Sequence, residues 1–150
     1  MKRVLTQIFL VLTAAAMLGF ALYMLWPHSF VDLQPDCDSI IVYRIDSANN
    51  QTIRQETCCA GSAEFEQIID LLSRYTYHRS FRTLVGANGM EGNRAGYWLH
   101  VYLDHGDDRV DFNCGGTGEV LIDGLVWRVG YLGNRASLAM MNELSDILEQ

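Results

Sequence analysis

The hydrophobic pattern of the chain begins with an apolar run from Val4 to Trp26, interrupted only by two threonines and a glutamine and preceded by Lys2 and Arg3. A helix needs about 20 apolar residues to span a bilayer, and cations at its amino end favour a cytoplasmic N-terminus. This run therefore predicts a single-pass membrane anchor over residues 1–27, in contact with the membrane through residues 4–26.

A cleaved signal peptide is the alternative interpretation of the same run. Signal peptides end at small residues, and Ala14 with Ala16 forms an A-x-A sequence. The residues after Ala16 are still apolar, so cleavage there would leave an apolar new terminus. The anchor is favoured for this reason. Both interpretations place residues 28–150 outside the cytoplasm, membrane-bound in the first case and secreted in the second.

After a predicted linker over residues 28–38, the pattern changes to strand and helix periods. Residues 39–45 are rich in β-branched and aromatic side chains and predict a strand, and residues 52–58 predict a weaker strand after a polar turn. Ser62 is a good N-cap, and apolar residues recur at helical spacing from there to Tyr75, which predicts a helix.

The clearest pattern lies at residues 97–114, where apolar and polar residues alternate on both sides of a turn over residues 105–108. Pairing Asp104 with Arg109 sets a register in which every aligned apolar pair lies on one face. Those pairs are Leu103–Val110, Val101–Phe112 and Leu99–Cys114. A shift by one residue would mix the two faces, so the pattern predicts both a hairpin and its register.

Three further segments complete the expected fold. Residues 79–85 are predicted as a strand, the glycine-rich residues 86–96 as a loop, and Asp123-Gly124 as the turn of a second hairpin before a last helix. The predicted fold class is α+β, with an N-terminal transmembrane helix, then a mostly antiparallel sheet of five or six strands with two helices packed on one face. The domain is expected to span residues 39–150.

The charge of the exported part bears on its partners. Without Lys2 and Arg3, 9 arginines remain against 18 acidic residues, a net charge of −9. Such an acidic domain is not expected to bind nucleic acid, which requires a basic surface. Roughly 120 residues suit one compact domain.

The four cysteines favour disulfide bonds, as is usual in exported domains. Adjacent residues of a strand point to opposite faces, so Cys58 and Cys59 are not expected to bond to each other. A first hairpin turning near Ala48-Asn49 would bring Cys37 close to Cys59. We therefore expect bonds between Cys37 and Cys59 and between Cys58 and Cys114. Exchanging Cys58 with Cys59 is the alternative.

Two groups of residues are candidate binding sites. Trp98, His100 and Tyr102 alternate on the polar face of the central hairpin, where large aromatic side chains can mark a contact surface. The alternative is that a helix or the loop over residues 86–96 covers them. The exported domain also has one basic cluster, a candidate anion site, although pairing with carboxylates is the commoner role of such clusters. It consists of Arg74, His78, Arg79 and Arg82.

No known catalytic motif occurs in the chain. It has no C-x-x-C, G-x-S-x-G or H-E-x-x-H sequence, and its glycine-rich stretches lack the lysine of a phosphate-binding loop. The sequence therefore predicts no catalytic residue, no metal site and no cofactor.

The order strand, strand, helix, strands, helix between about residues 38 and 150 resembles small uncharacterised exported α+β domains of bacteria, carried behind a signal peptide or membrane anchor. The resemblance rests on the stretches SIIVYRI, EFEQIIDLLSRY, WLHVYLD and VLIDGLVWRVG. It implies export and an α+β fold, and it transfers no functional residues.

These observations favour a non-enzymatic module that binds a protein, a peptide or an envelope component close to the membrane. The alternatives are a thiol-dependent enzyme at the cell surface and a small inhibitor or immunity-type protein.

Overall fold

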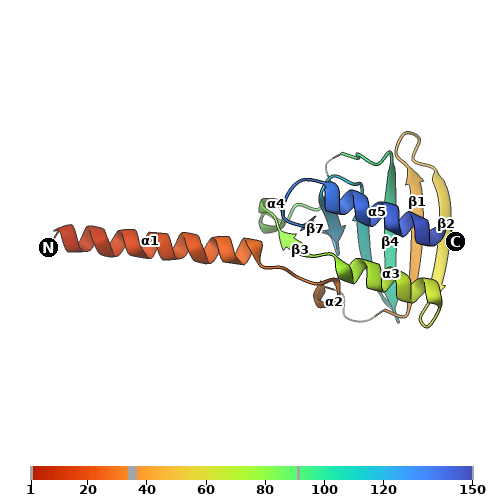
Figure 1. The fold of residues 1–150 in the computed structure, drawn as a ribbon, viewed down its shortest axis with the longest axis horizontal. Coiled ribbons are helices and arrows are strands. Elements are labelled where there is room, and N and C mark those ends of the chain that lie inside the picture. Colours follow the sequence, from red (N-terminus) through yellow and green to blue (C-terminus); the bar gives the residue numbers. More distant parts are fainter. Residues whose placement is uncertain (1, 34–36, 91, 150) are drawn as a thin grey trace.

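The computed structural model describes residues 2–33, 37–90 and 92–149. A long N-terminal helix leads into one α+β domain (Figure 1). The elements follow one another as α1 (Lys2–Leu25), α2 (Phe30–Leu33), β1 (Ser39–Asp46), β2 (Thr52–Cys59), α3 (Ala63–Arg74), β3 (Tyr77–Arg79), α4 (Phe81–Leu84), β4 (Tyr97–His105), β5 (Asp108–Cys114), β6 (Glu119–Ile122), β7 (Leu125–Val129) and α5 (Arg135–Leu148).

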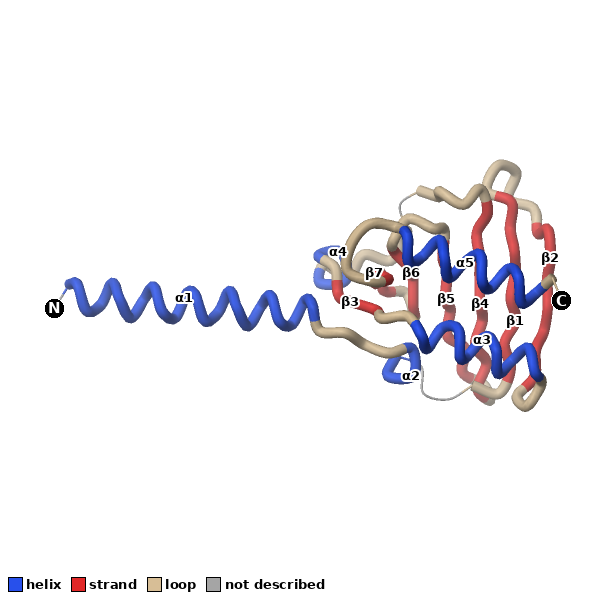
Figure 2. Tube along the Cα trace, viewed as in Figure 1, coloured by secondary structure: helices blue, strands red, loops and turns tan. Residues whose placement is uncertain are grey.

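The sheet has seven strands in the order β2-β1-β4-β5-β6-β7-β3, and every neighbouring pair is antiparallel. Helices α3 and α5 lie side by side over one face of it (Figure 2). The α+β class and the antiparallel sheet are confirmed. The expected count of five or six strands was wrong because β3, only three residues long, is too short to show an alternating pattern.

The predicted strand over residues 79–85 is also corrected. β3 ends at Arg79, and α4 begins directly after Ser80. The Ser80 hydroxyl accepts from the Thr83 N–H at 3.2 Å, and the Thr83 hydroxyl accepts from the Ser80 N–H at 2.8 Å. This reciprocal cap starts a helix at the point where the pattern had suggested a strand.

The central hairpin has the predicted register. Asp104 pairs with Arg109, and the three apolar pairs are aligned as expected. Their side chains face α3 and α5 and form the middle of the core, in which Leu99, Val101 and Leu103 are fully buried. The core is completed by α3 and α5, whose buried residues include Ile68, Leu71, Leu72, Met140, Met141 and Leu144.

The segment expected to be a linker, residues 28–38, packs against the domain in its described part. Phe30 is 1% exposed, and its ring lies 6.0 Å from the ring of Phe112. His28 forms a backbone bridge with Tyr77 of β3. Residues 34–36 lie outside the described part of the chain. Helix α1 is therefore joined to the domain through packed residues.

Helix α1 contains a candidate membrane span from Arg3 to Leu25, 23 residues with a mean hydropathy of 2.3. An anchor and a signal sequence share these properties. The predicted anchor segment, residues 1–27, begins with a residue outside the described part and otherwise coincides with α1 and the two residues after it.

Candidate functional site

Three predicted residues share the face of the sheet that points away from α3 and α5, which we call the open face. Because Leu99, Val101 and Leu103 of β4 face the core, strand alternation turns Trp98, His100 and Tyr102 the other way. Their neighbours on β1 are Ile45, Tyr43 and Ile41. All three predicted side chains are partly exposed.

A hollow of about 230 Å³ opens on this face. Its lining residues are Asn50, Met90, Trp98, His100, Asn113 and Leu121. Two of the three predicted residues therefore belong to it. Tyr102 does not line it, and its ring instead packs edge-on against Tyr43 at 5.5 Å and lies under the Arg109 guanidinium at 5.1 Å.

Trp98 is held by a glycine on the neighbouring strand end. A Cβ on Gly115 would lie 2.4 Å from Cζ3 of Trp98, so the indole rests on the bare backbone at that position. The glycine-rich stretch after β5 thus gives the tryptophan its place. This role was not visible in the sequence, where the stretch only suggested a turn.

Asn113 is the most unusual group of the site. It pairs with His100 on one side and Leu121 on the other, and it is 8% exposed. Its Oδ1 is buried and accepts no hydrogen bond from the described residues. Leaving a buried acceptor unpaired costs about 1–3 kcal/mol. Asn113 therefore combines a place in the lining of the hollow with a buried acceptor that has no partner among the described residues.

His100 stands beside Asn113 in an environment that keeps it neutral. Burial lowers the pKa of its imidazole, and the Asp111 carboxylate opposes this in part. A neutral imidazole can donate through one nitrogen and accept through the other. The hollow therefore offers three polar side chains, those of Asn50, His100 and Asn113, beside three apolar ones.

Stability is expected to decrease below neutral pH because of His100. In the unfolded chain this imidazole takes up a proton near the ordinary value of 6.5, whereas the folded state resists it. The stabilisation that comes from keeping His100 neutral is therefore fully present above pH 6.5. It is lost as the pH falls through the lowered pKa of the folded state. Urea titrations between about pH 5 and about pH 7.5 would measure the free energy of unfolding. We expect it to fall less at the acidic end in His100→Gln than in the wild type. Equal losses would contradict this.

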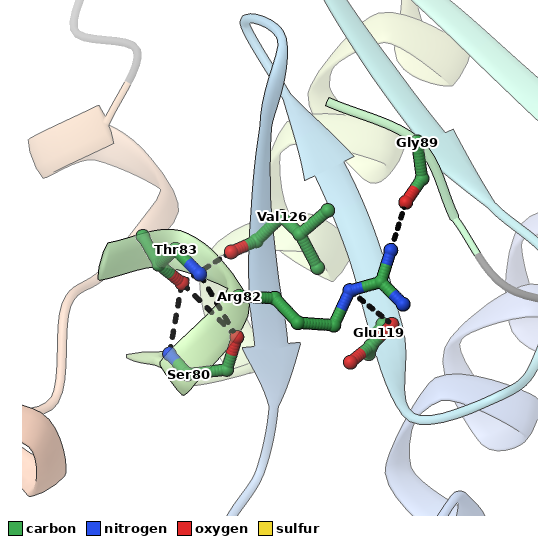
Figure 3. A network of polar contacts seen from close by, with 6 residues as sticks. All are labelled: Ser80, Arg82, Thr83, Gly89, Glu119 and Val126. Atoms are coloured by element: carbon green, nitrogen blue, oxygen red, sulfur yellow. Dashed lines mark hydrogen bonds and ion pairs between the residues drawn. The ribbon is translucent and has the colours of Figure 1, made fainter. Parts of the chain in front are cut away.

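The loop after α4 supplies another lining residue, Met90, and Figure 3 shows the contacts of the neighbouring residue Gly89 and of α4. The Arg82 guanidinium donates to the Gly89 carbonyl and lies 3.8 Å from the Glu119 carboxylate of β6. Arg82 thus connects the residue before Met90 to the sheet. It acts as a positioning residue, a role that no pattern in the sequence indicated.

The helix before the loop is fixed as well. The Thr83 hydroxyl donates to the Val126 carbonyl of β7, and the Val126 N–H donates to the Ala87 carbonyl at 3.3 Å. Helix α4 and the start of the loop are therefore bonded to β7. The predicted loop over residues 86–96 has one residue, 91, outside the described part.

The basic cluster is divided among different partners. Arg74 lies 3.4 Å from Asp70 and 3.1 Å from Glu143, and Arg82 contacts Gly89 and Glu119 as described. His78 is 2% exposed and stacks on Tyr131, with ring centroids 4.1 Å apart. Arg79 lies 4.3 Å above the ring of Tyr23 in α1. The structure does not gather the four side chains around one point.

The cysteines are free thiols in the structure, and all four lie in its described part. Cys58 is in β2 and Cys114 is in β5, so the strand order places them three strand spacings apart, about 14 Å. A disulfide requires Cα atoms within about 7 Å. The expected Cys58–Cys114 bond is therefore wrong, and exchanging Cys58 with Cys59 leaves the same separation.

The expected bond between Cys37 and Cys59 is also absent from the structure. The β1–β2 register pairs Cys59 with Ser39, two residues beyond Cys37. The Cys37 thiol instead donates to the Ser39 carbonyl at 3.1 Å. The hairpin turns where expected, since Ile45 pairs with Thr52, but the register shifts by one residue between Arg44 and Ile45, and this shift moves Cys37 and Cys59 further from direct opposition.

A larger cavity of about 420 Å³ lies along β2, between the start of α3 and the end of α5. It is lined in part by Cys58 and Cys59. Several of its polar groups have partners: Arg54 Nε lies 3.0 Å from Glu56 Oε1, and the Ser62 hydroxyl accepts the Phe65 N–H. It presents no buried unpaired group among its described lining, so the smaller hollow is the better candidate site.

The thiols are expected to differ widely in reactivity. Burial raises the pKa of Cys114 to about 12 and raises the pKa of Cys58 and Cys37 as well, whereas Cys59 is exposed. The thiolate is the reactive form. Iodoacetamide followed by peptide mass mapping is expected to find Cys59 alkylated first and Cys114 only after unfolding in guanidinium chloride. Native alkylation of Cys114, or its recovery in a disulfide, would contradict the fold.

Among the described residues, no group of three or more His, Cys, Asp or Glu side chains is placed to hold a metal ion. No protein-family model matches this chain, and no curated protein and no solved structure matches it either. The site must therefore be interpreted from its own geometry.

Proposed function

We propose that this chain is a membrane-anchored, non-enzymatic module whose extracytoplasmic domain binds a protein or peptide partner on the open face of its sheet. In this proposal α1 crosses the membrane with its amino end in the cytoplasm, as Lys2 and Arg3 favour. The observation that carries the binding role is Asn113, which lines the hollow and whose buried Oδ1 has no hydrogen-bond partner among the described residues.

The size of the hollow favours a side chain over a free metabolite. Pockets for small molecules usually measure about 300–1,000 Å³, whereas this one has about 230 Å³. That volume accommodates one anchoring side chain of a larger partner. Partners of this kind bind through a few aromatic or apolar anchors seated in pockets, with weaker contacts around them.

The walls of the hollow define the chemistry of that anchor. Trp98, Met90 and Leu121 offer apolar surface, and Asn113 Oδ1 requires a donor. The preferred anchor is therefore an apolar or aromatic group that also carries an N–H or O–H, as in tryptophan or tyrosine. Thiol chemistry is less well supported, since burial raises the pKa of three of the four cysteines.

Peptide selection tests the binding role directly. Random peptides displayed on phage would be selected on the full-length chain in detergent micelles, and enriched peptides measured by fluorescence polarisation. We expect Trp98→Ala to weaken binding about tenfold or more, because it removes a central aromatic anchor. Gln55→Ala is the matched control, since Gln55 is exposed on the same face and outside the hollow. Failure to enrich any peptide, or equal binding by Trp98→Ala, would overturn the proposal.

Asn113→Leu separates binding from folding. Leucine has a similar volume and leaves no unpaired acceptor, so we expect the free energy of unfolding to rise by about 1 kcal/mol. Binding of the selected peptides should weaken in the same variant. A loss of stability with unchanged binding would show that Asn113 serves the fold alone.

A further inference from the structure

Exposed apolar side chains gather at the end of the domain from which α1 emerges. Phe81 is 71% exposed, Val85 63% and Leu132 88%. Two neighbours, Leu84 and Tyr131, are also exposed. These five residues come from α4 with its C-cap and from the segment between β7 and α5, and we call them the proximal surface. Figure 1 shows α4 and β3 at the end of the domain that faces α1.

Direct contacts fix the end of α1 to this part of the domain. The N–H and carbonyl groups of His28 and Tyr77 bond reciprocally at 2.9 Å. The His78 Nδ1–H donates to the Leu25 carbonyl at 3.1 Å, since a carbonyl only accepts. Arg79 lies over the ring of Tyr23. β3 is therefore held against the last turn of α1, and α4 follows β3 directly after Ser80.

The length of α1 determines where its end lies in a bilayer. The span of 23 residues measures about 34 Å at about 1.5 Å per residue, slightly more than the roughly 30 Å hydrocarbon layer. Leu25 is thus expected at the lipid–water boundary, next to Tyr23 and Trp26, which suit that position. The elements bonded to this turn must lie at the same level.

The charge around the proximal surface also favours contact with a membrane. Residues 76–90 and 124–136, which contain the proximal surface, carry four arginines and no acidic residue, although residues 28–150 as a whole contain 18 acidic residues and 9 arginines. Glu119 of the neighbouring strand β6 lies 3.8 Å from Arg82. Arginine binds phosphate strongly and bidentately. The two positions that adjoin these ranges in the sequence, 91 and 123, are acidic, so four arginines stand against two carboxylates there. Apolar side chains with an excess of arginine around them suit a phospholipid surface.

We propose that the proximal surface rests in the headgroup region of the membrane, with Phe81, Val85 and Leu132 inserted at the edge of the acyl layer. This inference depends on the proposed anchoring by α1. Interfacial segments of this kind bury apolar side chains about 5–10 Å into the headgroup boundary. The domain is then held in one orientation on the bilayer. The strands follow one another outward from β3 at the membrane to β2 farthest away (Figure 2). The plane of the sheet, and with it the open face, is then roughly perpendicular to the membrane surface.

Photo-crosslinking to lipid tests the inference on the full-length chain. Benzoylphenylalanine would replace Phe81 or Leu132, both exposed enough to tolerate it, in protein purified and reconstituted into phosphatidylcholine–phosphatidylglycerol vesicles. Ile53, 58% exposed on β2, is the matched control at the opposite end of the sheet. Phe9 in α1, 68% exposed, reports on the anchor itself. Mass spectrometry would detect the adducts.

We expect lipid adducts at Phe9, Phe81 and Leu132 and none at Ile53. Adducts at Phe9 alone would overturn the proposed resting surface and leave the anchor intact. The absence of an adduct at Phe9 would overturn the anchor. Adducts at Phe81 or Leu132 to a second copy of the chain, in place of lipid, would show that the surface serves self-association and would overturn the inference.

Discussion

Replacing Gly118 with alanine is expected to destabilise the domain by about 2–5 kcal/mol. A Cβ at this position would lie 2.3 Å from the Gly133 carbonyl oxygen, a backbone atom that cannot rotate away, and the backbone of Gly118 has φ +93°. The same glycine connects two elements, since its N–H donates to the Ser137 hydroxyl at 2.8 Å and its carbonyl accepts the Val129 N–H at 3.0 Å. Relieving the clash would disturb both bonds.

Gly124→Ala is the control that separates the clash from backbone strain. Gly124 also has a positive φ, +72°, but nothing lies within 4 Å of the position of a new Cβ. The loss of stability in Gly124→Ala should therefore be limited to roughly 1–2 kcal/mol, the cost of holding a residue with a Cβ in the left-handed conformation. Urea titrations followed by circular dichroism would measure both variants. Equal losses would show that the close approach of Gly133 to Gly118 does not contribute.

Replacing Tyr77 with alanine is expected to lower the free energy of unfolding by about 3–5 kcal/mol, the usual cost of removing a buried aromatic ring. Tyr77 is fully buried, and its ring lies 6.3 Å from Phe30 and 6.2 Å from Phe112. Its hydroxyl donates to the Leu72 carbonyl at 2.9 Å. Tyr77 thus joins β3 of the sheet to α2 and α3.

Tyr77→Phe is the matched control for the hydroxyl group. It keeps the ring and removes one hydrogen bond, so a loss of about 1 kcal/mol is expected. In Tyr77→Ala the contacts that fix α1 should weaken as well, because His28 bonds to the backbone of Tyr77. Limited proteolysis should therefore cut sooner between α1 and β1 in this variant. A loss below about 1 kcal/mol in Tyr77→Ala would contradict the packing described here.

The candidate site was predictable in part. Strand alternation placed Trp98 and His100 on the open face, because a period of two is a local property of the chain. Asn113 was aligned with His100 in the same register, but nothing in the pattern indicated that its amide would be buried and unpaired. Met90, which lines the same hollow, comes from a distant loop that the Arg82 contacts hold.

The disulfide prediction failed for a related reason. It combined the positions of Cys58 and Cys59 in the first hairpin with the orientation of Cys114 toward the core. Cys58 and Cys114 are indeed buried. The prediction required β2 and β5 to be close, whereas β1 and β4 separate them. Facing the same core does not bring two residues together when the sheet is seven strands wide.

By itself the sequence determined the apolar N-terminal helix, the α+β class, the N-cap of α3 and the register of the central hairpin, because each depends on side-chain periods within a short segment. The tertiary structure alone decided the strand order, the pairing of β3 with β7, the closing of the hollow by Met90 and the seating of β3 against the end of α1. These depend on which distant segments meet. Hydrophobic attraction is non-directional, so an apolar face specifies that it will be buried without specifying its neighbour.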